Sequence, residues 1–400
     1  MFEQILIAAI LGIFIGIFTG LTPGVHVNLV SILVLSFSSY LLGIFNSVAI
    51  GSFIISLAIT HTFLDALPSI YLGAPDEAQA LNVLPGHRLL IKGMGHAAIT
   101  YTVIGALSSL LLSLLLFPLF IFSMKVIEPV IKDYIGYFLV LIMAYMILKD
   151  KKRFFSFIMF LISGILGIIV LSLPNTNQPL LPLLSGLFGF SILVESLLQK
   201  SRIPEQNTNA KLNLPKKNLV KAGAAATGMG FIAAFLPGFG SSQAAIVATN
   251  IVGDIKDEGF LTLVGGINTA NMLISIATAY ILNKSRNGAI LVVNQLLNGI
   301  NFKTMLVFLA VALIAGAAAA ILTLKISKIF CKYIVKVNYK ALIISILIFV
   351  FILCFTFDSW IGLLILITST FIGIAAAELG IGKNHLMGCL ILPVILFFIL

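Results

Sequence analysis

The chain has 400 residues, of which 60% are apolar and 10% are charged, and its formal net charge is +10. A water-soluble domain needs more polar surface than this composition offers, so the bilayer is the expected solvent for most of the chain. The excess of lysine and arginine lies in short segments beside apolar stretches, which is typical of cytoplasmic loops and argues against a role in binding nucleic acid.

Apolar stretches long enough for a spanning helix, roughly 20 residues, recur along the chain. They are predicted near 3–22, 46–64, 97–123, 134–148, 154–173, 180–198, 218–236, 260–282, 302–324, 341–357, 359–377 and 385–400. Two shorter stretches, 25–44 and 286–299, are predicted to belong to broken or re-entrant helices. The expected fold is an all-α polytopic protein of the plasma membrane.

A polar stretch at 200–217, with two prolines and several asparagines, divides the chain near its middle. On each side, a Pro-Gly pair follows the first apolar stretch, at Pro23-Gly24 and at Pro237-Gly238. This repetition predicts an N-terminal transmembrane repeat, a cytoplasmic linker and a C-terminal transmembrane repeat. Their expected bounds are 1–199, 200–217 and 218–400.

The charge of matching loops predicts how the two repeats are oriented. Loop 125–133 carries both signs and is neutral, whereas its counterpart 325–340 has five lysines and no acidic residue. Equivalent loops of inverted repeats face opposite sides of the membrane. We therefore predict two repeats of opposite topology, with both termini outside the cell and with broken helices that meet near the bilayer midplane.

Each Pro-Gly pair is a candidate binding site. Proline removes a backbone N–H and glycine lets the chain leave helical geometry, so the break exposes the positive end of the helix that follows. Two such ends that meet in a cavity would bind an anion. A single pair would more often be a packing kink, but two copies followed by small polar residues favour a site. The predicted substrate-binding residues are Thr22, Pro23, Gly24, His26, Asn28, Pro237, Gly238, Gly240, Ser241, Ser242 and Gln243.

Two further groups of polar residues interrupt apolar stretches. His61 and Asp65 share one face of a helix and are candidates for binding a coupling ion, because an unmatched charge in a bilayer is costly. Solvation of both at the membrane interface is the alternative. Asn268 and Asn271 could bind a carboxylate or a sodium ion, and hydrogen bonding between helices explains them equally well.

No phosphate-binding loop, metal-binding histidine spacing or nucleophile motif occurs in the sequence. We therefore expect neither an enzyme nor a bound cofactor or metal, other than a coupling Na⁺ or H⁺. The expected energy source is an ion gradient or a partner protein.

The order of these motifs resembles the large membrane subunit of tripartite tricarboxylate transporters, the TctA family, in its compact archaeal form. The matching segments are Gly20-x-x-Pro23-Gly24, Phe235-Leu-Pro237-Gly238-Phe-Gly240, the stretch from Leu67 to Lys92-Gly93, and Asn268 to Asn271. The resemblance implies import of carboxylates with a small membrane subunit and a solute-binding protein. His26-Val-Asn28 departs from the small residues usual in bacterial members, which implies a changed substrate.

The leading interpretation is a permease, a secondary transporter that moves a small organic anion such as a carboxylate and is coupled to a cation gradient. A translocase for a polyprenyl-phosphate lipid carrier is the alternative, and Arg88, Lys92 and Arg286 turned inward would favour it. A third interpretation is a membrane scaffold or enzyme without a transport cycle, in which His61 and Asp65 form an acid–base pair. A homodimer is compatible with each of them.

Overall fold

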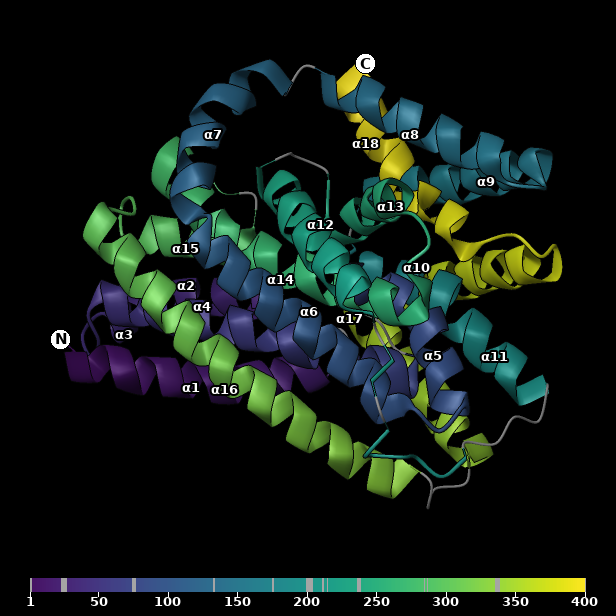
Figure 1. Ribbon diagram of the computed structural model, residues 1–400, viewed down its shortest axis with the longest axis horizontal. Helices are drawn as coiled ribbons and strands as arrows, with labels where there is room; N and C mark the ends of the chain where they lie inside the picture. The colour runs from purple at the N-terminus through teal and green to yellow at the C-terminus, as the bar shows by residue number, and fades with distance from the viewer. Residues whose placement is uncertain are drawn as a thin grey trace.

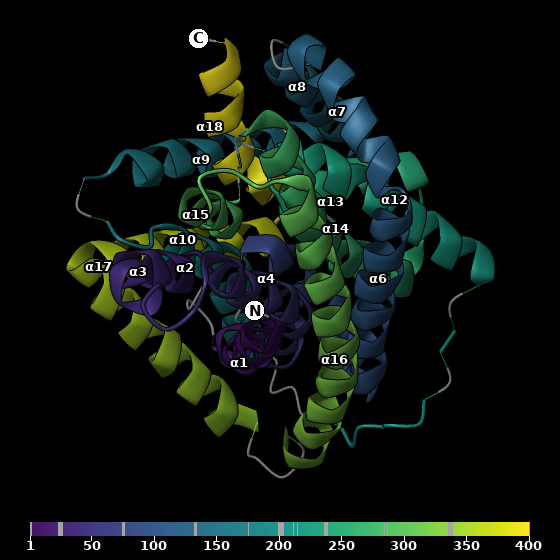
Figure 2. The ribbon, with the colours of Figure 1, turned by 90° about the vertical axis from the view of Figure 1, so that its left-hand side faces the viewer.

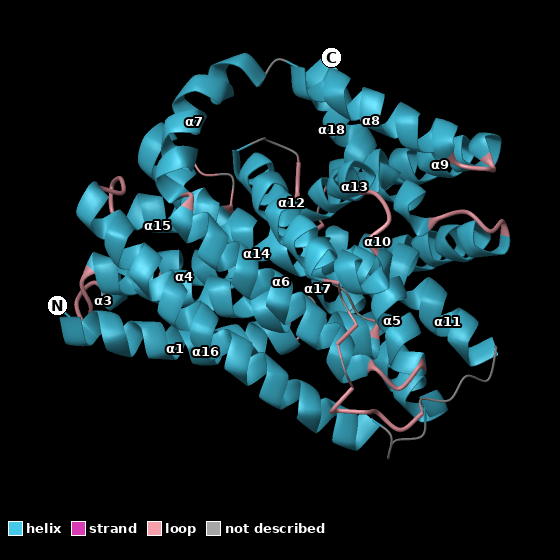
Figure 3. Ribbon diagram, viewed as in Figure 1, coloured by secondary structure: helices cyan, strands magenta, loops and turns pink. Residues whose placement is uncertain are grey.

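The computed structural model describes residues 2–22, 27–73, 77–131, 134–174, 176–198, 204–210, 212–213, 215–235, 239–283, 285, 287–334 and 339–399. Throughout these residues the regular elements are helices joined by loops, and none is a strand (Figure 3). The prediction of an all-α protein is therefore confirmed.

The first half of the chain forms helices up to Leu198. They are α1 (Phe2–Leu21), α2 (Val27–Ser36), α3 (Ser38–Leu41), α4 (Ser47–Leu64), the π-helix η1 (Pro68–Leu72), the 3₁₀-helix η2 (Glu77–Asn82), α5 (Val83–Ile91), α6 (Gly95–Leu115), α7 (Phe117–Ile131), α8 (Ile135–Lys149), α9 (Arg153–Ser172), α10 (Leu180–Leu184), the π-helix η4 (Ser185–Phe190) and α11 (Ser191–Leu198).

The second half begins with α12, inside the range predicted for the linker. Its helices are α12 (Lys216–Phe235), α13 (Ser241–Val252), α14 (Lys256–Leu282), α15 (Gly288–Leu296), α16 (Phe302–Ile334), α17 (Tyr339–Glu378), the 3₁₀-helix η5 (Lys383–Met387) and α18 (Gly388–Ile399). The chain ends beside α8 at the top of Figure 1.

Seven helical segments of the described chain are long and apolar enough to cross a membrane, as expected of a multi-pass membrane protein. They are Phe2–Leu21, Ser47–Leu72, Gly95–Leu115, Arg153–Ser172, Lys256–Leu282, Phe302–Ile334 and Ile343–Glu378. This is fewer than the predicted apolar stretches. The stretch 97–123 is interrupted at Leu116 between α6 and α7, and 134–148, 180–198 and 385–400 form shorter helices.

The predicted boundary near Asp358 coincides with a kink in α17. Ser359 has a φ of 53°, which is not helical. The buried Asp358 carboxylate accepts hydrogen bonds from the backbone N–H groups of Asn177 (2.5 Å) and Gln178 (3.0 Å). These bonds hold the kink against the loop before α10.

The core is built around two central helices, α4 and α14. Helix α4 packs on α1 and α16, whereas α14 packs on α6 and α12. Figure 2 shows α6 and α16 side by side. Glycine allows α6 and α14 to approach each other closely, because a Cβ at Gly105 of α6 would lie 1.9 Å from the Thr262 carbonyl oxygen of α14. Small residues at such contacts let membrane helices approach closely and gain van der Waals packing.

The described part of the linker packs against the connection between α5 and α6. The Asn207 N–H donates to the Gly93 carbonyl (2.8 Å), and the Gln206 side-chain oxygen accepts from the Gly95 N–H (2.9 Å). The linker residues and the C-terminal end of α5 therefore lie on the same side of the protein.

A polar cluster joins the turn between α8 and α9 to η5. Asp150 Oδ2 lies 2.9 Å from His385 Nε2, and Asp150 Oδ1 accepts from the Lys152 N–H at 2.9 Å. Partial burial by itself raises the pKa of Asp150, but the hydrogen bonds from Lys152 and His385 outweigh this effect and lower the pKa below its usual value.

Replacing Asp150 with asparagine is expected to destabilise the protein by about 0.5–1 kcal/mol at neutral pH. The carboxylate is better stabilised in the folded protein, so its contribution is present above the unfolded pKa of about 3.9 and is lost as the pH falls through the folded pKa. Thermal unfolding in detergent from pH 3 to pH 7 checks this. A difference between wild type and Asp150→Asn that stays constant with pH would contradict it.

Candidate functional site

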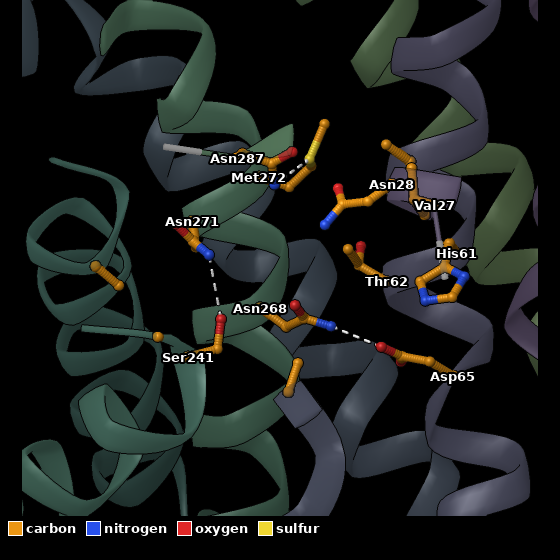
Figure 4. A pocket seen from close by; sticks show the side chains of 14 residues that line it. Val27, Asn28, His61, Thr62, Asp65, Ser241, Asn268, Asn271, Met272 and Asn287 are labelled. Carbon is orange, nitrogen blue, oxygen red and sulfur yellow. Dashed lines mark hydrogen bonds between the residues drawn. The ribbon is translucent and has the colours of Figure 1, made fainter. Parts of the chain in front are cut away.

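A cavity of about 170 Å³ lies where residues of the two halves of the chain meet. Figure 4 shows side chains of α2 and α4 on one side and of α13, α14 and the start of α15 on the other. Its polar lining consists of Asn28, His61, Thr62, Asp65, Ser241, Asn268, Asn271 and Asn287. The rest of the lining is apolar or small: Val27, Ala58, Ala78, Ala233, Gly240 and Met272.

Three helices begin at this cavity. Val27 is the first residue of α2, Ser241 is the first residue of α13, and Asn287 precedes α15. Asn287 caps α15, because its side-chain oxygen accepts from the Ala289 N–H at 3.0 Å. No acidic residue lies in the first turn of these helices. Their partial positive charges therefore favour an anion in the cavity.

Four carboxamides converge on the same space. Asn271 Nδ2 donates to Ser241 Oγ at 3.2 Å, and Asn287 Nδ2 lies 3.2 Å from Met272 Sδ. Asn28 packs closely on the start of α15, since a Cβ at Gly288 would lie 2.9 Å from the Asn28 side-chain oxygen. A carboxamide offers two N–H donors and a carbonyl acceptor, so this lining can hydrogen-bond a carboxylate without a full positive charge.

Asp65 is the acidic group of the described lining, and only 3% of its surface is exposed. Its Oδ2 accepts from Asn268 Nδ2 of α14 at 2.7 Å, and its Oδ1 accepts from Gln79 Nε2 of η2 at 2.8 Å. Hydrogen bonds from two amides to both oxygens suit an ionised carboxylate. An ionisable residue buried inside a membrane protein is a candidate functional group, because burying its charge costs several kcal/mol.

His61 lies one helical turn before Asp65 and is also buried, with 5% of its surface exposed. Its Nδ1 lies 3.1 Å from Thr19 Oγ1 of α1. The Thr19 hydroxyl donates its own proton to the Gly16 carbonyl at 3.2 Å. We therefore assign His61 Nδ1 as the donor in the bond between His61 and Thr19. The burial of His61 and Asp65 disagrees with the alternative that both are solvated at the membrane interface.

The structure brings together predicted residues from both halves of the chain. Asn28, Gly240, Ser241, Asn268, Asn271, His61 and Asp65 all line the cavity. Thr22, Ser242 and Gln243 are described but do not line it. Pro23, Gly24, His26, Pro237 and Gly238 lie outside the described residues. Binding of substrate by the lining residues stays a prediction.

Three residues in and around the cavity were not predicted from the sequence: Thr62, Asn287 and Gln79. Thr62 lies next to His61 and could have been found from that position. Asn287 directly follows the predicted Arg286, and its position at the start of an apolar stretch is a helix N-cap signal. Gln79 gives no signal in the sequence, because its role depends on how η2 folds back toward α4.

A second cavity, of about 350 Å³, lies at the opposite end of α13 and is more apolar. Arg88 lines it and forms an ion pair with Asp257 at the start of α14, with 53% of the Arg88 side chain exposed. Lys383 also lines it, and its Nζ donates to Ser191 Oγ at 2.7 Å. Arg88 and Lys92 thus do not line the first cavity, and Arg286 lies outside the described residues.

Comparison with known families decides the class of this protein. The family model described as the tripartite tricarboxylate transporter TctA family matches residues 6–388. The chain belongs to the TctA family. This confirms the resemblance predicted from the Pro-Gly motifs. A Methanocaldococcus jannaschii protein, described as uncharacterized, is similar to this chain. It is 30% identical over 405 residues, which cover 98% of this chain and 99% of that protein.

No solved structure significantly matches this TctA-family chain. The family and the seven apolar helical segments together identify a multi-pass membrane protein of a transporter family. The relative is archaeal and has nearly the same length, in agreement with the compact archaeal form of TctA.

Proposed function

We propose that this TctA-family protein is a secondary active transporter that carries a small organic anion, a carboxylate, coupled to a cation gradient. The first cavity is the proposed substrate site. The observation that carries the proposal is the meeting of three helix N-termini and four carboxamides beside the buried Asp65. Family membership supports transport of this class.

The charge of the cavity supports coupling to a cation. No arginine or lysine occurs in its described lining, so the groups that attract an anion there are the helix starts, the carboxamide N–H groups and the His61 ring. The Asp65 carboxylate repels the anion electrostatically. Two like unit charges about 4 Å apart repel by about 4 kcal/mol at an effective dielectric constant of 20. A Na⁺ or H⁺ at Asp65 would remove this repulsion. Binding of the anion and of the cation would then favour each other.

The size of the cavity supports a small substrate. Its volume of about 170 Å³ is below the roughly 300–1,000 Å³ of sites for drug-sized ligands. This favours a short carboxylate. The lipid-phosphate alternative needs cations at the site, but Arg88 pairs with Asp257 and Lys92 is exposed outside the cavity.

The proposal includes two inverted repeats with both termini outside the cell. A repeated contact supports two related halves, since Gly16 of α1 faces the Leu57 carbonyl of α4 and Gly230 of α12 faces the Ile267 carbonyl of α14. Family membership also supports a small membrane subunit and a solute-binding protein as partners. A homodimer is compatible with this arrangement.

Thermal stabilisation of the purified protein tests the substrate class. A ligand that binds only the folded state at 100 times its Kd raises the free energy of unfolding by about 2.7 kcal/mol. We expect stabilisation by di- or tricarboxylates in the presence of Na⁺ or at low pH. Asn271→Leu should abolish it, because the variant loses a donor that lines the cavity. The matched control Asn209→Leu, at an exposed linker position, should keep it.

Two outcomes would contradict the proposed substrate. Stabilisation by a short-chain polyprenyl phosphate alone would favour the lipid-carrier translocase. No response to carboxylates, inorganic phosphate or the lipid phosphate would favour a scaffold or enzyme without a transport cycle.

A further inference from the structure

Helix α14 reaches both cavities of this protein. Lys256, Asp257 and Phe260 in its first turns line the second cavity. Asn268 and Asn271 in its middle line the first cavity. Asn268 follows Asp257 by 11 positions, a rise of about 16 Å along an α-helix. Because α14 is long and apolar enough to cross a membrane, the first cavity lies near the middle of this span and the second at its N-terminal end.

Two elements, η2 and α13, lie between the cavities and pack on each other. Ala78 of η2 lines the first cavity, and Ala80, two positions later, lines the second. Helix α13 begins at the first cavity with Ser241 and lines the second with Thr249, near its C-terminal end. A movement that parts η2 from α13 would therefore join the two cavities.

Both walls of the second cavity adjoin basic loops. The Gly93 carbonyl, two residues after α5, accepts from the Asn207 N–H of the lysine-rich linker at 2.8 Å. Lys152 Nζ, in the basic turn at 149–153, donates to the Leu379 carbonyl at 2.7 Å, four residues before η5. Basic loops of membrane proteins face the cytoplasm. By this rule the second cavity is on the cytoplasmic side.

The rim of the second cavity is exposed and electrically balanced. Arg88 forms an ion pair with Asp257, and their side chains are 53% and 27% exposed. Lys256 and Asp254 are exposed as well, and Asp254 Oδ1 accepts from the Lys256 N–H at 3.0 Å. Water and ions screen charges at such positions, so the rim exerts little pull on an anion.

Lys383 of η5 lies in the buried floor of the second cavity. Only 9% of its surface is exposed, and the lining residues Phe188 and Ile192 are buried and apolar. Its Nζ donates to Ser191 Oγ at 2.7 Å, which uses one of three N–H donors. Glu195, one turn after Ser191, attracts the same ammonium group but does not line the cavity. A carboxylate in the floor would meet a cation in apolar surroundings, where charge attraction is strong.

We propose that the second cavity is an anion site through which the carboxylate passes between the first cavity and the cytoplasm, and that Lys383 binds it there. This inference rests on the proposed function. The second cavity is larger than the first, at about 350 Å³ against about 170 Å³. A short di- or tricarboxylate therefore fits with water around it, which suits a site from which it is released.

Modification of a thiol in the second cavity tests the site. Thr249→Cys places a thiol in the lining. The native Cys331, Cys354 and Cys389 are buried, so the parent protein serves as the background. An anionic and a cationic methanethiosulfonate reagent are compared, each relative to its rate with a free thiol in solution. We expect the anionic reagent to be favoured at least about 10-fold, because a positively charged cleft concentrates anions.

Two further readouts use the same Thr249→Cys protein with Lys383 intact. Membrane-impermeant reagents should label it in inverted membrane vesicles, which expose the cytoplasmic side, and not in intact cells. Saturating succinate or citrate should slow the labelling, because the carboxylate occupies the cavity. Asn209→Cys, in the exposed linker, is the matched control and should be labelled at a rate that neither carboxylate changes.

Lys383→Met removes the charge and should abolish the preference for the anionic reagent. It should also lower uptake of succinate or citrate into proteoliposomes at least about 10-fold, because the charged partner of the carboxylate is lost. Both carboxylates should still stabilise this variant through the first cavity. Ser191→Ala removes the hydrogen-bond partner of Lys383 but keeps the charge, so it should keep the reagent preference and the uptake.

Several results would overturn the inference. They are labelling of Thr249→Cys only from outside, a reagent preference that Lys383→Met leaves unchanged, and equal losses of uptake in Ser191→Ala and Lys383→Met, which would make Lys383 an anchor of η5 on α11. Protection by a short-chain polyprenyl phosphate alone would identify a lipid site instead. If the wild type neither binds nor takes up a carboxylate, the proposed function fails, whereas a reagent preference that depends on Lys383 still supports an anion site.

Discussion

Asp65→Asn is expected to reduce cation-driven uptake of the carboxylate at least about 100-fold, since one buried group supplies the charge that the cation compensates. The variant keeps the size of the side chain and removes its negative charge. Binding of the anion should therefore persist and no longer depend on the cation, because the repulsion in the cavity is gone. Uptake into proteoliposomes and thermal stabilisation by the carboxylate measure these two effects.

Asp254→Asn is the matched control for the charge change. Asp254 lies between α13 and α14, away from the first cavity, and its Oδ1 accepts from the Lys256 N–H at 3.0 Å. We expect uptake by this variant to stay near the wild-type rate. Uptake by Asp65→Asn that is still driven by the cation gradient would exclude Asp65 as the coupling group.

Gly105→Ala is expected to cause a larger loss of stability than the same change at Gly95, the other glycine of α6. The added Cβ would lie 1.9 Å from the Thr262 carbonyl oxygen, so the backbones of α6 and α14 must move apart. Overpacking of this kind costs about 1–3 kcal/mol, and more where the backbone has to move. Thermal unfolding in detergent and the yield of folded protein measure the effect.

Gly228→Ala provides the opposite control. Gly228 lies within α12, and a Cβ added there would have no atom of a neighbouring element within 4 Å. Alanine should stabilise the helix by roughly 0.5–1 kcal/mol through its higher helix propensity. Equal losses of stability in Gly105→Ala and Gly228→Ala would contradict the close packing of α6 on α14.

The sequence by itself predicted an all-α membrane protein and the places where two of its helices end. Helix α1 ends at Leu21 and α12 ends at Phe235, each shortly before a Pro-Gly pair. Both features depend on local chemistry. Long apolar stretches require lipid or a protein interior, which gives the membrane class. Proline disrupts a helix, which gives the places where the two helices end. The helical spacing of His61 and Asp65 is local in the same sense, and both side chains line the cavity.

Only the tertiary structure decided which polar residues share a cavity. Asn28, Asp65, Asn268 and Asn287 are far apart in the sequence. The two Pro-Gly pairs predict that the starts of α2 and α13 meet, but no local pattern indicates that the start of α15 lies at the same cavity. Gln79 reaches Asp65 only because η2 folds back to the C-terminal end of α4. Ser242 and Gln243 do not line the cavity although they directly follow Ser241. Helix packing and chain reversal set these positions, and both depend on contacts between distant segments rather than on the neighbours of each residue.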